Sequence, residues 1–208
     1  MTAVQGVVFD IGGVLERIDP VTFLDRWQER LGLSDAAMAA ALTHVDPDNV
    51  GPVGGIDEYE VRRQYQAALG LDDQQADELV RDLWDWYCGE LDKDLMTYAR
   101  SLRGRVRLAI LSNSGPGARE VEQERHDFAA LFDPIIYSHE VGLTKPDARV
   151  YELTAERLGL PIGSLVFVDD VAANIDGARA AGMQVHLHTN TSVTIAALDR
   201  LLGHRDVR

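Results

Sequence analysis

Leu165-Val166-Phe167-Val168-Asp169-Asp170 is a continuous apolar run that ends in two aspartates. A strand that is apolar on both faces is typical of a parallel sheet covered by helices on both sides. Short apolar runs recur along the chain, and segments of helical spacing separate the later ones; the runs are 7–9, 106–111, 135–137 and 185–187. This alternation predicts an α/β fold, a Rossmann-like doubly wound parallel sheet.

The segment between the first two apolar runs has helical spacing only. Candidate N-caps precede its helical stretches at Ser34, Asp57 and Asp72. Because this segment lies between two strands of one sheet, it is predicted to be an insertion rather than a tandem domain. We expect a Rossmann-like core made by residues 1–15 and 104–208, interrupted by a helical cap made by residues 16–103.

Composition limits the partners of the chain. Its 208 residues include 20 Lys and Arg and 34 Asp and Glu, which gives a net charge of −14 with neutral histidines. Such a charge disfavours nucleic acid and anionic membranes, and no apolar run approaches the roughly 18 residues of a membrane span. Cys88 is the single cysteine, which excludes an intrachain disulfide. We expect a cytoplasmic protein, monomeric or homodimeric, without nucleic-acid or membrane partners.

Polar residues follow the apolar runs where strands of a parallel sheet present their carboxyl ends. Asp10, Ser112-Asn113 and Asp169-Asp170 each follow a run, and a turn presents Lys145. Each alone could be a helix cap, a turn or a solvated lysine. Their recurrence after successive strands instead favours one shared ligand site at this edge of the sheet.

These residue types suit phosphoryl transfer. The carboxylates of Asp10 and Asp169-Asp170 would repel each other unless a cation lies between them, and Mg²⁺ prefers such oxygen ligands. A hydroxyl, backbone N–H groups and Lys145 can hold a phosphate. The pattern therefore predicts a small phosphorylated substrate, Mg²⁺ as cofactor, and Asp10 as a nucleophile that forms an aspartyl-phosphate.

The same residues resemble the four motifs of the haloacid dehalogenase-like hydrolase superfamily, in the branch with a helical cap after the first strand. The resemblance lies in Phe9–Leu15, Leu111–Asn113, Lys145–Asp147 and Val168–Asp170. Phe9–Leu15, with Gly55–Tyr59 in the cap, is also similar to the α-glucose-1-phosphate phosphatase type. The resemblance implies a hydrolase, specifically a Mg²⁺-dependent phosphatase of small phosphorylated metabolites, with sugar phosphates as one candidate class.

The resemblance also implies roles for the metal ligands. Asp10 would be both nucleophile and magnesium ligand, and Asp170 a direct ligand. Asp169 would hold a metal-bound water, or it would contact the metal ligands without binding the metal itself. The backbone carbonyl of Gly12 would supply a further oxygen.

The resemblance implies a phosphate-binding set as well. Ser112 and the backbone N–H of Asn113 would bind the phosphoryl oxygens. Lys145 would neutralise both the phosphate and the nucleophile, which makes it a catalytic residue together with Asp10.

One position departs from the family pattern. Phosphatases of this superfamily place an acid two residues after the nucleophile, where it protonates the leaving oxygen, and here that position is Gly12. Proton assistance of this kind contributes about 10²–10⁴-fold in rate. A good leaving group, such as an anomeric sugar oxygen, would need less of it. Glu16 and Asp19 are candidate substitutes, although linker charges are the simpler interpretation.

Two alternatives stay open. Loss of the acid at Gly12 would also fit a non-catalytic binding or regulatory protein. A 2-haloacid dehalogenase is the other alternative, but the fourth motif of those enzymes resembles Ser-Ser-Asn, where this chain has the Asp169-Asp170 pair.

The cap is expected to set substrate choice by closing over the site. Its tryptophans, Trp27, Trp84 and Trp86, are expected to pack the cap's own core.

Overall fold

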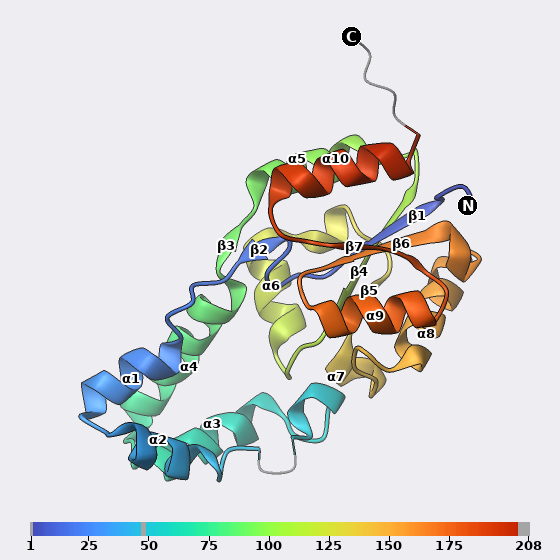
Figure 1. Ribbon diagram of the computed structural model, residues 1–208. Coiled ribbons are helices and arrows are strands. Elements are labelled where there is room, and N and C mark those ends of the chain that lie inside the picture. The colour runs from blue at the N-terminus through green and yellow to red at the C-terminus, as the bar shows by residue number, and fades with distance from the viewer. Residues whose placement is uncertain (1, 47–48, 204–208) are drawn as a thin grey trace.

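The computed structural model describes residues 2–46 and 49–203; the remainder of the predicted core and cap ranges lies outside these residues. A five-stranded sheet forms the centre of the molecule (Figure 1). Its order is β5 (Ile135–Tyr137), β4 (Arg107–Ser112), β1 (Gly6–Phe9), β6 (Leu165–Asp169) and β7 (Gln184–Leu187). All four pairings are parallel. The predicted Rossmann-like α/β fold is confirmed.

Helices cover both faces of this sheet (Figure 1). The helices from residue 93 onward are α5 (Lys93–Ser101), α6 (Ala118–His126), α7 (Ser138–Val141), α8 (Ala148–Leu158), α9 (Ala172–Ala180) and α10 (Thr191–Leu201). Short 3₁₀ turns lie at Phe128–Ala130 and Ile162–Ser164. Val7 and Phe9 pack in the apolar cluster that includes α5 and α10, whereas Val8 packs in the cluster that includes α8 and α9. Successive side chains of a strand point to opposite faces, so this central strand must be apolar throughout.

The segment inserted after β1 forms helices α1 (Phe23–Leu31), α2 (Asp35–Leu42), α3 (Glu58–Leu69) and α4 (Asp73–Cys88). A 3₁₀ turn, η1 (Gly51–Val53), lies between α2 and α3. The predicted caps Ser34, Asp57 and Asp72 accept hydrogen bonds from the first turn of α2, α3 and α4. These four helices share an apolar cluster of their own, separate from the two clusters on the sheet.

Two short strands connect this helical layer to the sheet. Strand β2 (Glu16–Arg17) pairs antiparallel with β3 (Glu90–Leu91), so the chain leaves the sheet layer and returns to it at one place (Figure 1). Helix α5 follows β3 and packs on the sheet, with Leu95 and Met96 buried in the cluster that contains Phe9. The last part of the predicted cap range thus packs with the sheet.

Local details differ from the sequence-based expectations. The spacing of residues 120–132 predicts one helix, but α6 ends at His126 because Asp127 adopts a left-handed conformation with φ 50°. Trp27 and Trp86 pack with the cap cluster as expected, whereas Trp84 is buried in a sheet cluster, which corrects the prediction for that residue.

None of the helices in the described part of the chain has the length and apolar character of a transmembrane span.

Candidate active site

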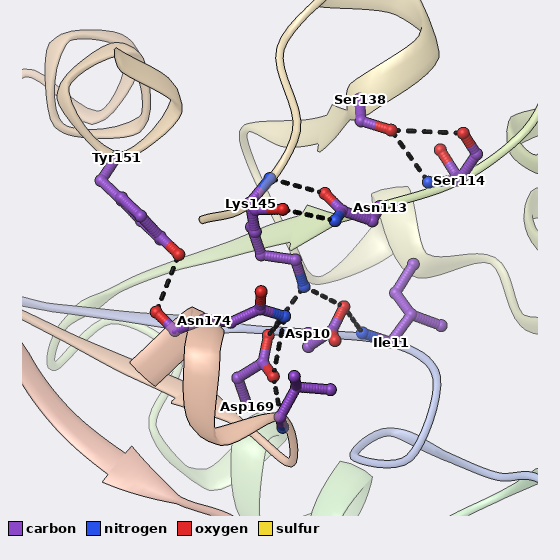
Figure 2. A network of polar contacts seen from close by, with 10 residues as sticks. Asp10, Ile11, Asn113, Ser114, Ser138, Lys145, Tyr151, Asp169 and Asn174 are labelled. Carbon is purple, nitrogen blue, oxygen red and sulfur yellow. Dashed lines mark hydrogen bonds and ion pairs between the residues drawn. The ribbon is translucent and has the colours of Figure 1, made fainter. Parts of the chain in front are cut away.

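The predicted site residues come together at the carboxyl ends of three adjacent strands. Asp10 directly follows β1, Ser112 ends β4 and Asp169 ends β6. These strands are neighbours in the sheet, so their ends deliver the three side chains to one edge. Lys145 reaches the same point from the loop between α7 and α8 (Figure 2).

Lys145 lies between two aspartates. Its Nζ is 2.8 Å from Asp10 Oδ1 and 2.8 Å from Asp169 Oδ2, and its side chain is 1% exposed. Burial raises the pKa of Asp10 above its ordinary value, while the charge of Lys145 and the hydrogen bond from the Ile11 amide oppose that rise. The lysine therefore favours the ionised carboxylate that a nucleophile needs.

Asn113 fixes the loop that carries this lysine. The Lys145 amide donates to Asn113 Oδ1 at 2.8 Å, and Asn113 Nδ2 donates back to the Lys145 carbonyl at 2.9 Å (Figure 2). The side chain of Asn113 thus binds the backbone of Lys145. This agrees with the expectation that the backbone N–H of Asn113, and not its side chain, contacts a phosphate.

Asp169 is fully buried and held from several sides. Its Oδ1 accepts from the Val171 amide at 2.7 Å, and Asn174 Nδ2 lies 3.1 and 3.2 Å from its two oxygens. Tyr151 in turn donates to the Asn174 carbonyl at 2.8 Å, so a buried chain of contacts orients this carboxylate (Figure 2). Charge-assisted bonds of this kind pre-organise a site.

Three carboxylates meet around the lysine. Asp10, Asp169 and Asp170 each offer an oxygen, and these oxygens lie within 4.8 Å of one another. Lys145 supplies a single positive charge against three negative ones, so a divalent cation fits the donor set and the charge. Partial burial and the charge of Asp169 raise the pKa of Asp170, which shows the repulsion that such a cation would relieve.

The two glycines after the nucleophile differ in the space around them. A Cβ at Gly12 would meet only the Ile18 side chain, at 4.0 Å, so position 12 has room for a side chain. A Cβ at Gly13 would lie 2.2 Å from Asp170 Oδ2, and Gly13 has a φ of +75°. Position 13 therefore requires a glycine, because a Cβ there would collide with the Asp170 carboxylate. At position 12 no steric contact explains the absence of an acid.

Glu16, a candidate substitute for that acid, is fully buried and does not line the cleft at the strand ends. Its Oε1 lies 3.1 Å from His126 Nε2, and neither of its oxygens has a hydrogen-bond partner among the described residues. Burial raises the pKa of Glu16 from 4.5 to about 9, which keeps it protonated at neutral pH. The interpretation of Glu16 as a linker charge is wrong, because its carboxyl is buried and protonated.

This buried acid predicts a pH-dependent stability. The folded chain keeps the Glu16 proton between pH 4.5 and about 9, whereas the unfolded chain releases it, so the free energy of unfolding falls as pH rises through that window. The expected slope is about 1.4 kcal/mol per pH unit. Glu16→Gln, which is neutral at every pH, should flatten the dependence of melting temperature on pH. The exposed Glu152→Gln is the matched control; equal slopes for Glu16→Gln and wild type would contradict this.

The inserted segment lines one side of the site. A cleft of about 540 Å³ is lined by Asp10, Lys145 and Asp170 from the sheet edge and by Ile18, Trp86 and Tyr87 from the inserted segment. Sequence reasoning did not identify Trp86 and Tyr87 as cleft residues. They lie on the last turn of α4, and only the return of the chain through β3 places them there.

Comparison with known proteins agrees with this geometry. A family model described as haloacid dehalogenase-like hydrolase matches residues 4–182. "Phosphatase MT3486" of Mycobacterium tuberculosis is 36% identical over 124 residues, 57% of this chain and 55% of the relative. The matched stretch thus spans about half the length of that relative.

Two further proteins match over most of the chain. "Sesquiterpene phosphatase astK" of Aspergillus oryzae is 25% identical over 205 residues, 97% of this chain and 98% of the relative. The HAD family enzyme bt-2542 of Bacteroides thetaiotaomicron, solved with magnesium and inorganic phosphate, superposes with a TM-score of 0.75 at 17% identity, covering 90% of this chain and 95% of that one. The latter likeness concerns the fold.

Proposed function

The chain belongs to the haloacid dehalogenase-like hydrolases, and we propose that it is a Mg²⁺-dependent phosphatase that forms an aspartyl-phosphate on Asp10. The observation that carries this proposal is the cluster of Asp10, Asp169 and Asp170 around the single buried Lys145. The phosphatase names of two relatives and the magnesium and phosphate in the Bacteroides structure support it.

In this mechanism an Asp10 carboxylate oxygen attacks phosphorus, the bond from phosphorus to the ester oxygen breaks, and the leaving alkoxide takes a proton from solvent water and departs as the alcohol. Lys145 favours the ionised form of Asp10 and offsets charge on the phosphoryl oxygens, which Ser112 and the Asn113 N–H also bind. Water then attacks the aspartyl-phosphate, which releases phosphate and restores the Asp10 carboxylate.

Metal binding follows from the same cluster. Asp10, Asp170 and the Gly12 carbonyl would hold Mg²⁺, with Asp169 supporting them from its buried position. Bound there, the ion would supply positive charge to the transferring phosphoryl group.

Hydrolysis of p-nitrophenyl phosphate with and without Mg²⁺ tests the proposal. Its leaving group needs little proton assistance, so we expect turnover with Mg²⁺ and a loss of at least about 100-fold with a chelator, restored by added Mg²⁺. Metal-independent turnover would contradict the proposal. Binding of inorganic phosphate without turnover of any phosphate ester would favour the alternative of a non-catalytic binding protein.

Restoring the missing acid gives a second prediction. Because position 12 has room for a side chain, Gly12→Asp should fold and should raise kcat for alkyl phosphates by about 10²-fold, with a much smaller effect on p-nitrophenyl phosphate. Gly13→Asp is the control, since the same side chain one residue later collides with Asp170. Equal effects of Gly12→Asp on good and poor leaving groups would contradict the role assigned to position 12.

We also propose that the segment inserted after β1 acts as the cap over this cleft, with its second boundary at β3 because α5 packs on the sheet. A small phosphorylated metabolite is the proposed substrate. The space beside Trp86 limits which organic group that metabolite can carry. The cytoplasmic location and the monomeric or homodimeric state stay predictions.

A further inference from the structure

A second cavity lies beside the cleft, and its walls are apolar. It has a volume of about 280 Å³, close to the lower end of the range of about 300–1,000 Å³ for ligand pockets. We call it the aromatic cavity; the residues that characterise it are Phe23, Tyr65, Leu83, Trp86 and Tyr87. They come from α1, α3 and α4 of the inserted segment.

The aromatic cavity and the phosphate-binding cleft share a wall. Trp86 and Tyr87 line both of them. Gly115 and Pro116 line the aromatic cavity on the sheet side, two and three residues after Asn113 in the cleft. The aromatic cavity therefore lies next to the cleft in which the phosphate of a substrate would be held at Asp10.

Ring contacts hold the cavity walls in place. The Phe23 ring lies 6.0 Å from that of Tyr65 and 5.7 Å from that of Trp86, between centroids. The Trp86 indole N–H is already used, because it donates to the Asp19 carbonyl at 2.8 Å. The tryptophan thus presents carbon surface rather than a donor to a ligand.

The charged groups among the lining residues have partners within the protein. Asp46 accepts from the Val50 and Gly51 amides, each at 2.8 Å, and Glu58 accepts from the Trp84 indole at 2.7 Å. Both groups are acidic, and no Lys, Arg or His occurs among the described residues that line the cavity. Such walls offer little to the hydroxyls of a sugar and nothing to a second anionic group.

We propose that the aromatic cavity binds the organic part of the substrate, and that the substrates are phosphate monoesters of apolar alcohols rather than sugar phosphates. This inference rests on the proposed phosphatase function, since it assigns the leaving group of that reaction. Burial of an alkyl or aryl group against these rings removes apolar surface from water, whereas a sugar would leave hydroxyls unpaired.

A substrate series tests the proposal on the intact protein with Mg²⁺. We expect kcat/KM for n-octyl phosphate to exceed that for ethyl phosphate by at least about 100-fold, because single methylenes in an apolar pocket contribute about tenfold or more. Glucose 6-phosphate, which like octyl phosphate has a primary alcohol as its leaving group, should be hydrolysed with a lower kcat/KM than octyl phosphate. A parallel comparison of 2-naphthyl with phenyl phosphate distinguishes an aromatic from an aliphatic preference.

Acetyl phosphate separates this inference from the function on which it rests. Its organic part is too small to fill the cavity, so its hydrolysis reports on the chemistry alone. Failure to hydrolyse acetyl phosphate or any ester of the series would overturn the phosphatase proposal itself. Hydrolysis of acetyl phosphate with octyl no better than ethyl phosphate, or with glucose 6-phosphate preferred to octyl phosphate, would overturn only the apolar assignment.

A cavity-filling variant adds a second readout. Val61 lines the cavity but belongs to none of the buried apolar clusters, so Val61→Trp should fill the cavity while the fold is kept. The octyl-to-ethyl ratio of kcat/KM should fall below about tenfold. Val193→Trp, at a helical valine that is 44% exposed, should keep the wild-type ratio. An unchanged ratio in Val61→Trp, with a normal melting temperature, would contradict the proposal.

Discussion

Asp10→Asn is expected to lower kcat for p-nitrophenyl phosphate by at least about 10⁴-fold, because an amide cannot attack phosphorus. The variant should still fold. Asn has nearly the shape of Asp and can keep the hydrogen bonds from the Ile11 amide and Lys145 Nζ to its oxygen. Steady-state kinetics together with thermal unfolding would separate lost chemistry from lost structure.

A matched control uses another aspartate of this chain. Asp35, in the first turn of α2, accepts a bond from the Gln28 side chain and does not line the cleft. Asp35→Asn should change kcat by less than about twofold, because it leaves the strand-end cluster intact. If Asp10→Asn keeps more than a tenth of the wild-type rate, Asp10 is not the nucleophile.

Lys145→Met is expected to give the second large loss, at least about 10³-fold in kcat/KM. The variant removes the only lysine in contact with Asp10 and Asp169 and with it a charge that opposes the phosphoryl oxygens. Two buried carboxylates would then face each other without that partner. The pKa of Asp10 should rise, since the lysine now lowers it. The acid limb of the pH–rate profile should move to higher pH.

That shift distinguishes electrostatics from simple unfolding. Loss of one partner of a buried ion pair typically costs about 3–5 kcal/mol, so melting temperatures must accompany the kinetics. Lys93→Met, at the start of α5, is the control for loss of a lysine away from the cleft. An unshifted acid limb in folded Lys145→Met would contradict the assigned role.

Much of the fold could be predicted because it depends on local patterns. Strand β5 begins and ends where its apolar run does, and Ser34, Asp57 and Asp72 cap helices as their positions indicate. The end of α6 was missed, since nothing local requires Asp127 to adopt a left-handed conformation. The two-residue strands β2 and β3 were missed because each exists only through pairing with the other.

The site was predictable where motifs mark it and not where tertiary packing makes it. The strand-end positions of Asp10, Ser112 and Asp169 follow from the order of the apolar runs, because parallel strands bring their ends to one edge. The burial of Glu16 depends on helix α6, more than a hundred residues along the chain. The exposure of Trp86 to the cleft likewise depends on how α4 lies over the sheet.

Transfer of the phosphoryl group through Asp10 is tested most directly by the stereochemical course of the reaction at phosphorus. A phosphorothioate monoester made chiral with oxygen isotopes would be hydrolysed by the wild-type protein, and the configuration of the released thiophosphate determined. Attack by Asp10 followed by attack by water inverts phosphorus twice, so net retention is expected. Net inversion would mean that water attacks the ester directly, and it would contradict the aspartyl-phosphate.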